Sequence, residues 1–179
     1  ISSILFVIAI VILIIAPLII LIFPVFYVQT FIYDKSAIVL YPDGMSFKIV
    51  IAACFMLLIG VIIPLIKQNK FTYSLLIIFI AGSFFVFYLS ILSYTYIGKE
   101  EVVSNKLFNE KTLKWSEIEE VVLEYYVDDR GTHEEYIFSS FDGDYIQIPL
   151  NGMYQREEKS EIYRIAKQYN IRFIEREKR

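Results

Sequence analysis

Ionisable side chains are absent from three long stretches of this 179-residue chain. Residues 4–27, 49–66 and 73–97 contain no Asp, Glu, Lys, Arg or His. A hydrocarbon core about 30 Å thick is crossed by about 20 helical residues at about 1.5 Å each, and the three stretches have comparable lengths. We therefore predict three transmembrane helices, with the lipid bilayer as the first partner of a multi-pass protein of the cell membrane.

The chain also contains only one cysteine and one histidine. Cys54 lies inside the second apolar stretch, so an intramolecular disulfide is excluded. His133 stands in a predicted turn where no catalytic triad is evident, and no glycine-rich phosphate loop occurs. We accordingly expect no catalytic residue, no metal site, no cofactor and no small-molecule substrate, and we predict that the protein is not an enzyme.

Several acidic residues are neighbours in the sequence, a pattern found in cation sites and in acid–base pairs. Four of them flank a predicted hairpin tip: Asp128, Asp129, Glu134 and Glu135. Carboxylates can hold a hard cation, but this loop lacks the ligand spacing of calcium sites, and we interpret it as a solvated tip. The pairs Glu119-Glu120 and Glu157-Glu158 face opposite or neighbouring sides of their elements, so spacing alone forms no acid–base pair.

Charge is divided unevenly along the chain. Residues 1–97 carry four Lys and two Asp, whereas residues 98–179 carry 13 Lys and Arg against 18 Asp and Glu, a difference of −5. A negative domain repels phosphate, which argues against nucleic acid and against anionic lipid headgroups as ligands. The single basic candidate, residues 172–179, is interpreted as a solvated tail.

The two connections between the apolar stretches differ in length. The long one, 28–48, contains the pattern strand 37–41, turn 42–44, strand 45–47. This predicted β-hairpin either docks on the C-terminal domain, which lies on the same side of the membrane, or forms a free loop at the interface. The short one, 67–70, predicts that the second and third helices form an antiparallel hairpin.

Small residues support close packing of these two helices: Ala52, Ala53 and Gly60 on the second, and Ala81, Gly82, Ser83, Ser90 and Ser93 on the third. The three serines have two interpretations. Ordinary helix packing, with hydroxyls bonded to the backbone, is favoured over the lining of a pore in a homo-oligomer, because three helices alone cannot enclose a path.

Beyond residue 97 the pattern changes to short alternating segments. They predict five antiparallel strands, at 102–108, 112–115, 118–127, 135–141 and 145–150. Apolar residues at three- and four-residue spacing then predict one amphipathic helix over 155–169, followed by a short strand over 171–174. The fold class is thus membrane α plus soluble α+β, with the transmembrane domain over 1–97 and the soluble domain over 98–179.

The soluble half carries a further pattern. Tyr96-Ile97-Gly98 enters a first strand, Trp115-x-x-Ile118-x-x-Val121 forms a central step, and one helix closes the domain. Over residues 96–170 this order resembles the bacterial pleckstrin-homology-like (PH-like) domains of membrane proteins. The resemblance implies a partial barrel, usually with seven strands before the helix, whereas the pattern here gives five. Alternation with Leu113 favours a core position for Trp115 over a ligand-stacking role.

Function is predicted from these features together. We expect a PH-like domain that binds another protein at the membrane surface, as a scaffold or regulator. The alternatives are an accessory or immunity component of a membrane transporter or antimicrobial-peptide system acting through its helices, and a lipid-binding module.

Orientation follows from Lys counts near the helix ends, six on the side of the C-terminal domain against two on the other, which favours a cytoplasmic domain. Because the chain begins at Ile1, we also expect a leader before it. The abundance of Ile, Phe, Tyr and Lys hints at a bacterial origin.

Overall fold

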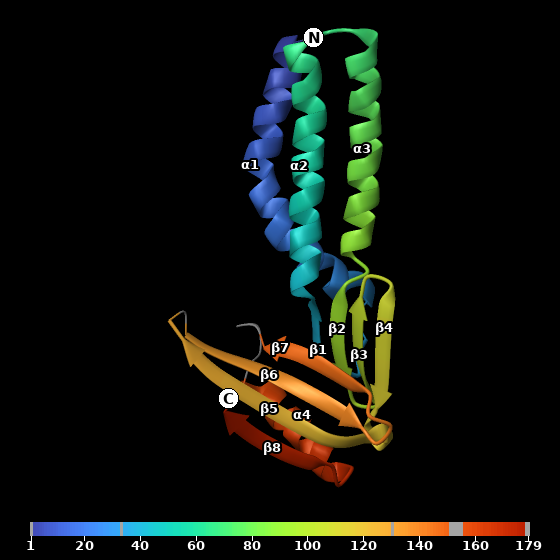
Figure 1. The fold of residues 1–179 in the computed structure, drawn as a ribbon, viewed down its shortest axis with the longest axis vertical. Coiled ribbons are helices and arrows are strands. Elements are labelled where there is room, and N and C mark those ends of the chain that lie inside the picture. Colours follow the sequence, from blue (N-terminus) through green and yellow to red (C-terminus); the bar gives the residue numbers. More distant parts are fainter. Residues whose placement is uncertain (1, 33, 130, 151–155, 178–179) are drawn as a thin grey trace. The chain divides into compact units, whose positions relative to one another are not determined.

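Three long apolar helices, two small sheets and one amphipathic helix make up the described part of the protein. The structure, a computed structural model, describes residues 2–32, 34–129, 131–150 and 156–177. The helices are α1 (Ser2–Tyr27), continued by the short π-helix η1 (Val28–Ile32), then α2 (Gly44–Ile66) and α3 (Lys70–Ser90) (Figure 1). All three are long and apolar enough to cross a membrane.

The two largest errors in the predicted helix boundaries are the start of the second helix and the end of the third. The second helix begins at Gly44 rather than 49, because the Asp43 carboxylate accepts a hydrogen bond from the backbone N–H of Met45 and caps it. Residues 45–47 are therefore helical, and the predicted second strand of the hairpin does not exist. The third helix ends at Ser90 rather than 97, and residues 94–98 form a strand instead.

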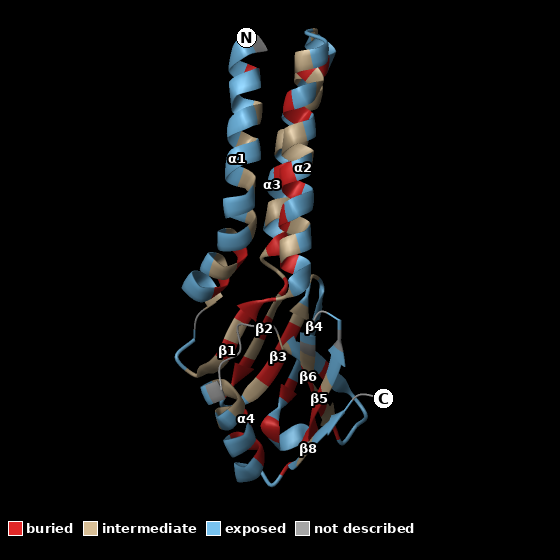
Figure 2. Cartoon of the chain, turned by 90° about the vertical axis from the view of Figure 1, so that its left-hand side faces the viewer, coloured by how far each residue is buried: buried red, intermediate tan, exposed pale blue. Residues whose placement is uncertain are grey.

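Close packing of α2 against α3 follows from small residues at their contact. A Cβ atom at Gly60 would lie 2.6 Å from the Cβ of Phe79, so only glycine fits there without a shift. The hydroxyl of Ser83 donates to the backbone carbonyl of Ala53, at 2.9 Å, across the two helices. Figure 2 shows the buried turns concentrated on α2, while α1 is mostly exposed.

Within the described ranges, eight strands form two four-stranded sheets. The first has the order β1 (Ala37–Pro42), β2 (Tyr94–Gly98), β3 (Glu101–Lys106), β4 (Asn109–Lys114). The second has the order β7 (Tyr145–Leu150), β6 (Gly131–Ser140), β5 (Ile118–Asp128), β8 (Arg172–Glu177), in which β8 runs parallel to β5. The 3₁₀ turn η2 (Trp115–Glu117) joins them, and the helix α4 (Arg156–Gln168) precedes β8.

Strand β1 shows that the long connection between α1 and α2 belongs partly to the sheets, so the free-loop alternative is wrong. Val39 is buried. The backbone N–H of Lys99 donates to the carbonyl of Ser36 at 3.2 Å, and the Ser36 hydroxyl lies 2.7 Å from that of Tyr96. Hydrogen bonds from Ser36 also hold the pKa of the Asp34 carboxyl below its usual value, while burial raises the pKa of Tyr96.

Two compact units result from this chain path. The helical unit contains α1, η1, α2, α3 and the segment 106–108, whereas the sheet unit contains the start of β1 up to residue 40, residues 95–105 and the chain from 109 onward. The sheet unit therefore draws on three separate stretches of sequence.

The core of the sheet unit is built around Trp115, which is completely buried. Its indole N–H donates to the carbonyl of Gly98 at 2.9 Å, and its ring makes an edge contact with Phe138 at 5.8 Å. Helix α4 closes this core with Ile162, Ile165 and Ala166, all buried. The prediction of a core role for Trp115 is confirmed.

Candidate interaction surface

The second sheet has one face packed in the core and an opposite face whose centre is buried and whose margin is exposed. Because side chains alternate along strands, residues that are directly opposite in register share a face. On the inner face, Val121, Tyr136, Phe138 and Ile148 have no exposed surface. We define the outer face by the alternate residues: Glu120, Val122, Glu124, Tyr126, His133, Glu135, Ile137, Ser139, Tyr145, Gln147, Pro149, Arg172, Ile174 and Arg176.

Two carboxylates form the centre of the outer face. Glu124 of β5 and Glu135 of β6 lie directly opposite each other, and each exposes less than a tenth of its surface. Like charges in this position repel, so each needs a partner. The Arg176 guanidinium donates to Glu124 at 2.5 and 2.7 Å, and the Gln147 amide donates to Glu135 at 2.5 Å. These bonds fix side chains from all four strands.

Aromatic and arginine side chains surround this centre. The ring of Tyr126 stacks on His133 at 4.8 Å with an interplanar angle of 16°. Tyr145 on the edge strand β7 exposes 56% of its surface, and the side chain of Arg172 on the other edge strand, β8, exposes 76%. Tyr and Arg are enriched at protein interfaces and among the few residues that contribute most to binding. The outer face therefore combines a fixed polar centre with residues suited to protein contact.

The acidic residues predicted at the hairpin tip do not converge on one point. Glu134 faces inward and pairs with Lys159 of α4, whereas Glu135 faces outward to Gln147. Asp129 is exposed, and the Asp128 side chain lies outside the described part. Across the described ranges, no three His, Cys, Asp or Glu side chains are grouped as metal ligands.

The other residues considered from sequence are also placed. Glu120 pairs loosely with Arg172, at 3.8 Å, while Glu119 is exposed at the bulge between Ile118 and Glu120. Residues 172–177 form β8, so the interpretation of 172–179 as a solvated tail is wrong for that segment. Glu157 is exposed and Glu158 is half-buried on α4.

No protein-family model and no curated protein matches the chain. The outer face was not anticipated as a site from the sequence. A sequence signal for this face existed in strand β5, where the alternate residues Glu120, Val122, Glu124 and Tyr126 share one side. Two of them, Val122 and Glu124, are buried although they do not belong to the inner face.

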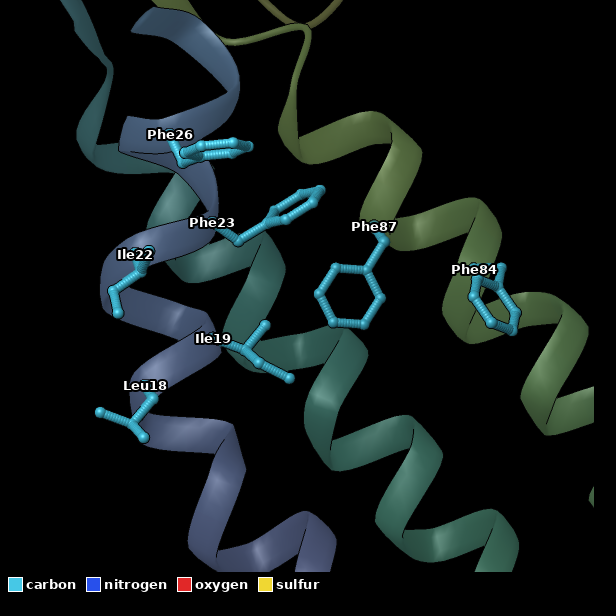
Figure 3. A pocket seen from close by; sticks show the side chains of 7 residues that line it. All are labelled: Leu18, Ile19, Ile22, Phe23, Phe26, Phe84 and Phe87. Atoms are coloured by element: carbon cyan, nitrogen blue, oxygen red, sulfur yellow. The ribbon is translucent and has the colours of Figure 1, made fainter. Parts of the chain in front are cut away.

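The helical unit has a separate apolar groove. A cavity of about 590 Å³ opens between α1 and α3, lined only by Leu18, Ile19, Ile22, Phe23, Phe26, Phe84 and Phe87. Figure 3 shows Phe23 and Phe87 directed toward each other, and their rings meet edge to face at 5.8 Å. The groove has no polar atom to fix the orientation of an occupant, so only apolar surface suits it.

The three serines of the predicted third helix are engaged in packing. Ser83 bonds across to α2, and the Ser90 hydroxyl donates to the Phe87 carbonyl at 2.7 Å. Ser93 lies beyond the helix and accepts from the backbone N–H of Leu107 at 3.1 Å. All three are buried within the helical unit, so their hydroxyls do not line its outer surface.

Proposed function

We propose that this chain is a non-enzymatic, membrane-anchored interaction protein whose sheet unit is a PH-like domain. Three helices hold it in the bilayer, and the outer face binds a partner protein at the cytoplasmic membrane surface, in a scaffolding or regulatory role. The observation that carries the proposal is the outer face itself: Glu124 and Glu135 are held in place by Arg176 and Gln147, beside exposed Tyr and Arg side chains.

Strand count supports the PH-like part of the proposal. Seven strands, β1 to β7, precede α4 in the described chain, which is the number that the resemblance implies. Two of these strands add to the five predicted beyond residue 97: β1, predicted as the strand 37–41 of a hairpin, and β2, which the pattern had assigned to the third helix. A net charge of −5 over residues 98–179 disfavours the lipid-binding alternative, since anionic headgroups would be repelled.

A second candidate function rests on the apolar groove between α1 and α3. Its seven apolar lining residues would suit a component of a membrane transporter or antimicrobial-peptide system that acts through its helices. In that case the partner would contact Phe84, which exposes 70% of its surface, rather than the sheet unit.

Photo-crosslinking in cells separates these two functions. A benzophenone side chain is placed at Tyr126 on the outer face, at Phe84 on α3, or at Tyr163, an exposed control on α4. We expect a discrete protein adduct from Tyr126 and none from Tyr163. An adduct from Phe84 alone favours the transporter-type function, and the absence of any adduct contradicts both.

Sidedness is tested separately, by protease treatment of intact and lysed cells. We expect the sheet unit to be protected until the cells are lysed. Cleavage in intact cells would place it outside and contradict the proposed cytoplasmic location.

A further inference from the structure

The four edge strands of the two sheets differ in how well they resist pairing with another chain. Charged side chains on an edge discourage strand addition. Strand β4 carries three charged side chains, Glu110, Lys111 and Lys114. Strand β8 carries four: Arg172, Glu175, Arg176 and Glu177. Strand β1 has no charge, but none of its residues is exposed. Strand β7 has no charge and exposes Tyr145, Gln147 and Pro149.

The hydrogen-bond pattern shows which backbone groups of β7 face away from β6. The N–H of Ser140 donates to the carbonyl of Asp144 at 2.8 Å, which makes this pair a hydrogen-bonded one. In an antiparallel ladder such pairs alternate, so Ile146 and Ile148 bond to β6. The backbone groups of Tyr145, Gln147 and Pro149 therefore point away from β6.

Two independent observations agree with this assignment. Pro149 has no N–H, and proline is accommodated in sheets where that group would face away from the neighbouring strand. The carbonyl oxygen of Tyr145 lies 3.5 Å from the Nζ atom of Lys111, which belongs to β4 and not to β6. The outward edge of β7 thus presents the N–H and C=O groups of Gln147 and the N–H of Tyr145, whose C=O already accepts from Lys111.

A cleft lies beside this edge. It has a volume of about 260 Å³ and is lined by Glu110, Lys111, Thr112 and Leu113 of β4 and by Asp144, Tyr145 and Ile146. The Lys111 ammonium is engaged by Tyr145, lying 5.3 Å from the centre of its ring. The two carboxylates, at Glu110 and Asp144, are exposed, so the cleft is electrostatically suited to a basic side chain.

We propose that an extended segment of the partner protein, carrying Lys or Arg, adds to β7 as a further strand. This inference rests on the proposed function and names how the partner is bound. Backbone groups of Tyr145 and Gln147 supply hydrogen bonds, and the carboxylates of Glu110 and Asp144 select the basic residue. Because β7 is an edge of the second sheet, the added strand extends the outer face and places its alternate side chains next to Tyr145.

The test replaces one outward N–H. Gln147→Pro removes that donor without removing a bond to β6, while Gln147→Ala loses the same side-chain bond to Glu135 but keeps the N–H. In cells carrying the benzophenone at Tyr126, we expect Gln147→Pro to reduce the adduct by at least about tenfold, whereas Gln147→Ala retains most of it. To show that the proline variant is folded, its solubilised full chain is melted and followed by Trp115 fluorescence. A melting temperature equal to that of the wild type establishes that it is folded.

A second variant does not depend on tolerance of proline. Glu110→Gln combined with Asp144→Asn changes only exposed side chains, and we expect it to weaken the adduct roughly two- to tenfold. A benzophenone at Tyr145 should capture the same partner, at a peptide containing Lys or Arg. Full adduct from Tyr126 in both the proline and the double variant would overturn strand addition while leaving the proposed function intact. Absence of the adduct from the unsubstituted protein would overturn both.

Discussion

The hydroxyl of Tyr136 offers a sharp test of the core of the sheet unit. Tyr136 is completely buried, and its oxygen has no hydrogen-bond partner among the described residues. Its ring packs against Phe138 and Phe173. A buried polar group without a partner costs about 1–3 kcal/mol, so Tyr136→Phe removes that cost and keeps the ring. We expect the variant to be more stable by about 1 kcal/mol.

The pH dependence gives the same residue a second readout. Burial, together with the charges of Glu134 and Glu175, raises the pKa of Tyr136 well above its ordinary value. In the unfolded chain this tyrosine ionises near pH 10, whereas in the folded chain it stays protonated. Ionisation therefore favours the unfolded state above pH 10, and the free energy of unfolding falls as pH rises beyond that value. By pH 11 the wild type should lose about 1.4 kcal/mol that Tyr136→Phe does not lose.

Urea unfolding of the solubilised full chain measures both effects. Trp115 is the only tryptophan, and it lies in the same core, in contact with Phe138. Tyr163→Phe is the matched control, because Tyr163 is half exposed and should show neither effect. A loss of more than about 0.5 kcal/mol in Tyr136→Phe at neutral pH would show that the hydroxyl has a stabilising partner, and the reasoning would fail.

Three further predictions follow from packing, charge and chain path. Gly60→Val should destabilise the helical unit by about 1–3 kcal/mol in thermal melts, whereas Gly44→Ala, with no neighbouring atom within 4 Å, should be nearly neutral. Arg176→Ala should lower the free energy of unfolding in urea by about 1–2 kcal/mol, because it leaves the nearly buried Glu124 carboxylate unpaired. Arg172→Ala, which removes only the loose pair with Glu120, should lower it by under about 0.5 kcal/mol. Equal losses in the two variants would contradict this. A fragment spanning 98–179 should not fold by itself.

Local sequence patterns were sufficient wherever an element is defined by its own residues. The apolar stretches predicted three helices, and alternation placed β5 and β7 almost to the residue. Helix α4 was found from its three- and four-residue spacing. In each case the neighbouring residues alone decide which face is buried.

Where burial depends on distant residues, the patterns gave the wrong element. Thr95 and Ile97 are buried in a strand, so the apolar run appeared to continue from the third helix through them. A buried strand and a buried helix cannot be separated by apolar content. The same applies to the outer face, where Glu124 meets its partner Arg176 more than fifty residues later.

The expected failure of the fragment 98–179 follows from the discontinuity of the sheet unit. The fragment lacks β1 and nearly all of β2, including Ile97, which has no exposed surface in the folded chain. Strand β3 would become an unpaired edge with its buried Val102 uncovered, which favours aggregation. Joining residues 34–42 by a flexible linker to 94–179 restores both strands, and we expect that protein to show the cooperative unfolding and shielded Trp115 emission of the full chain. Equal folding of the two fragments would show that β1 and β2 are dispensable, and that the sheet unit begins after the third helix.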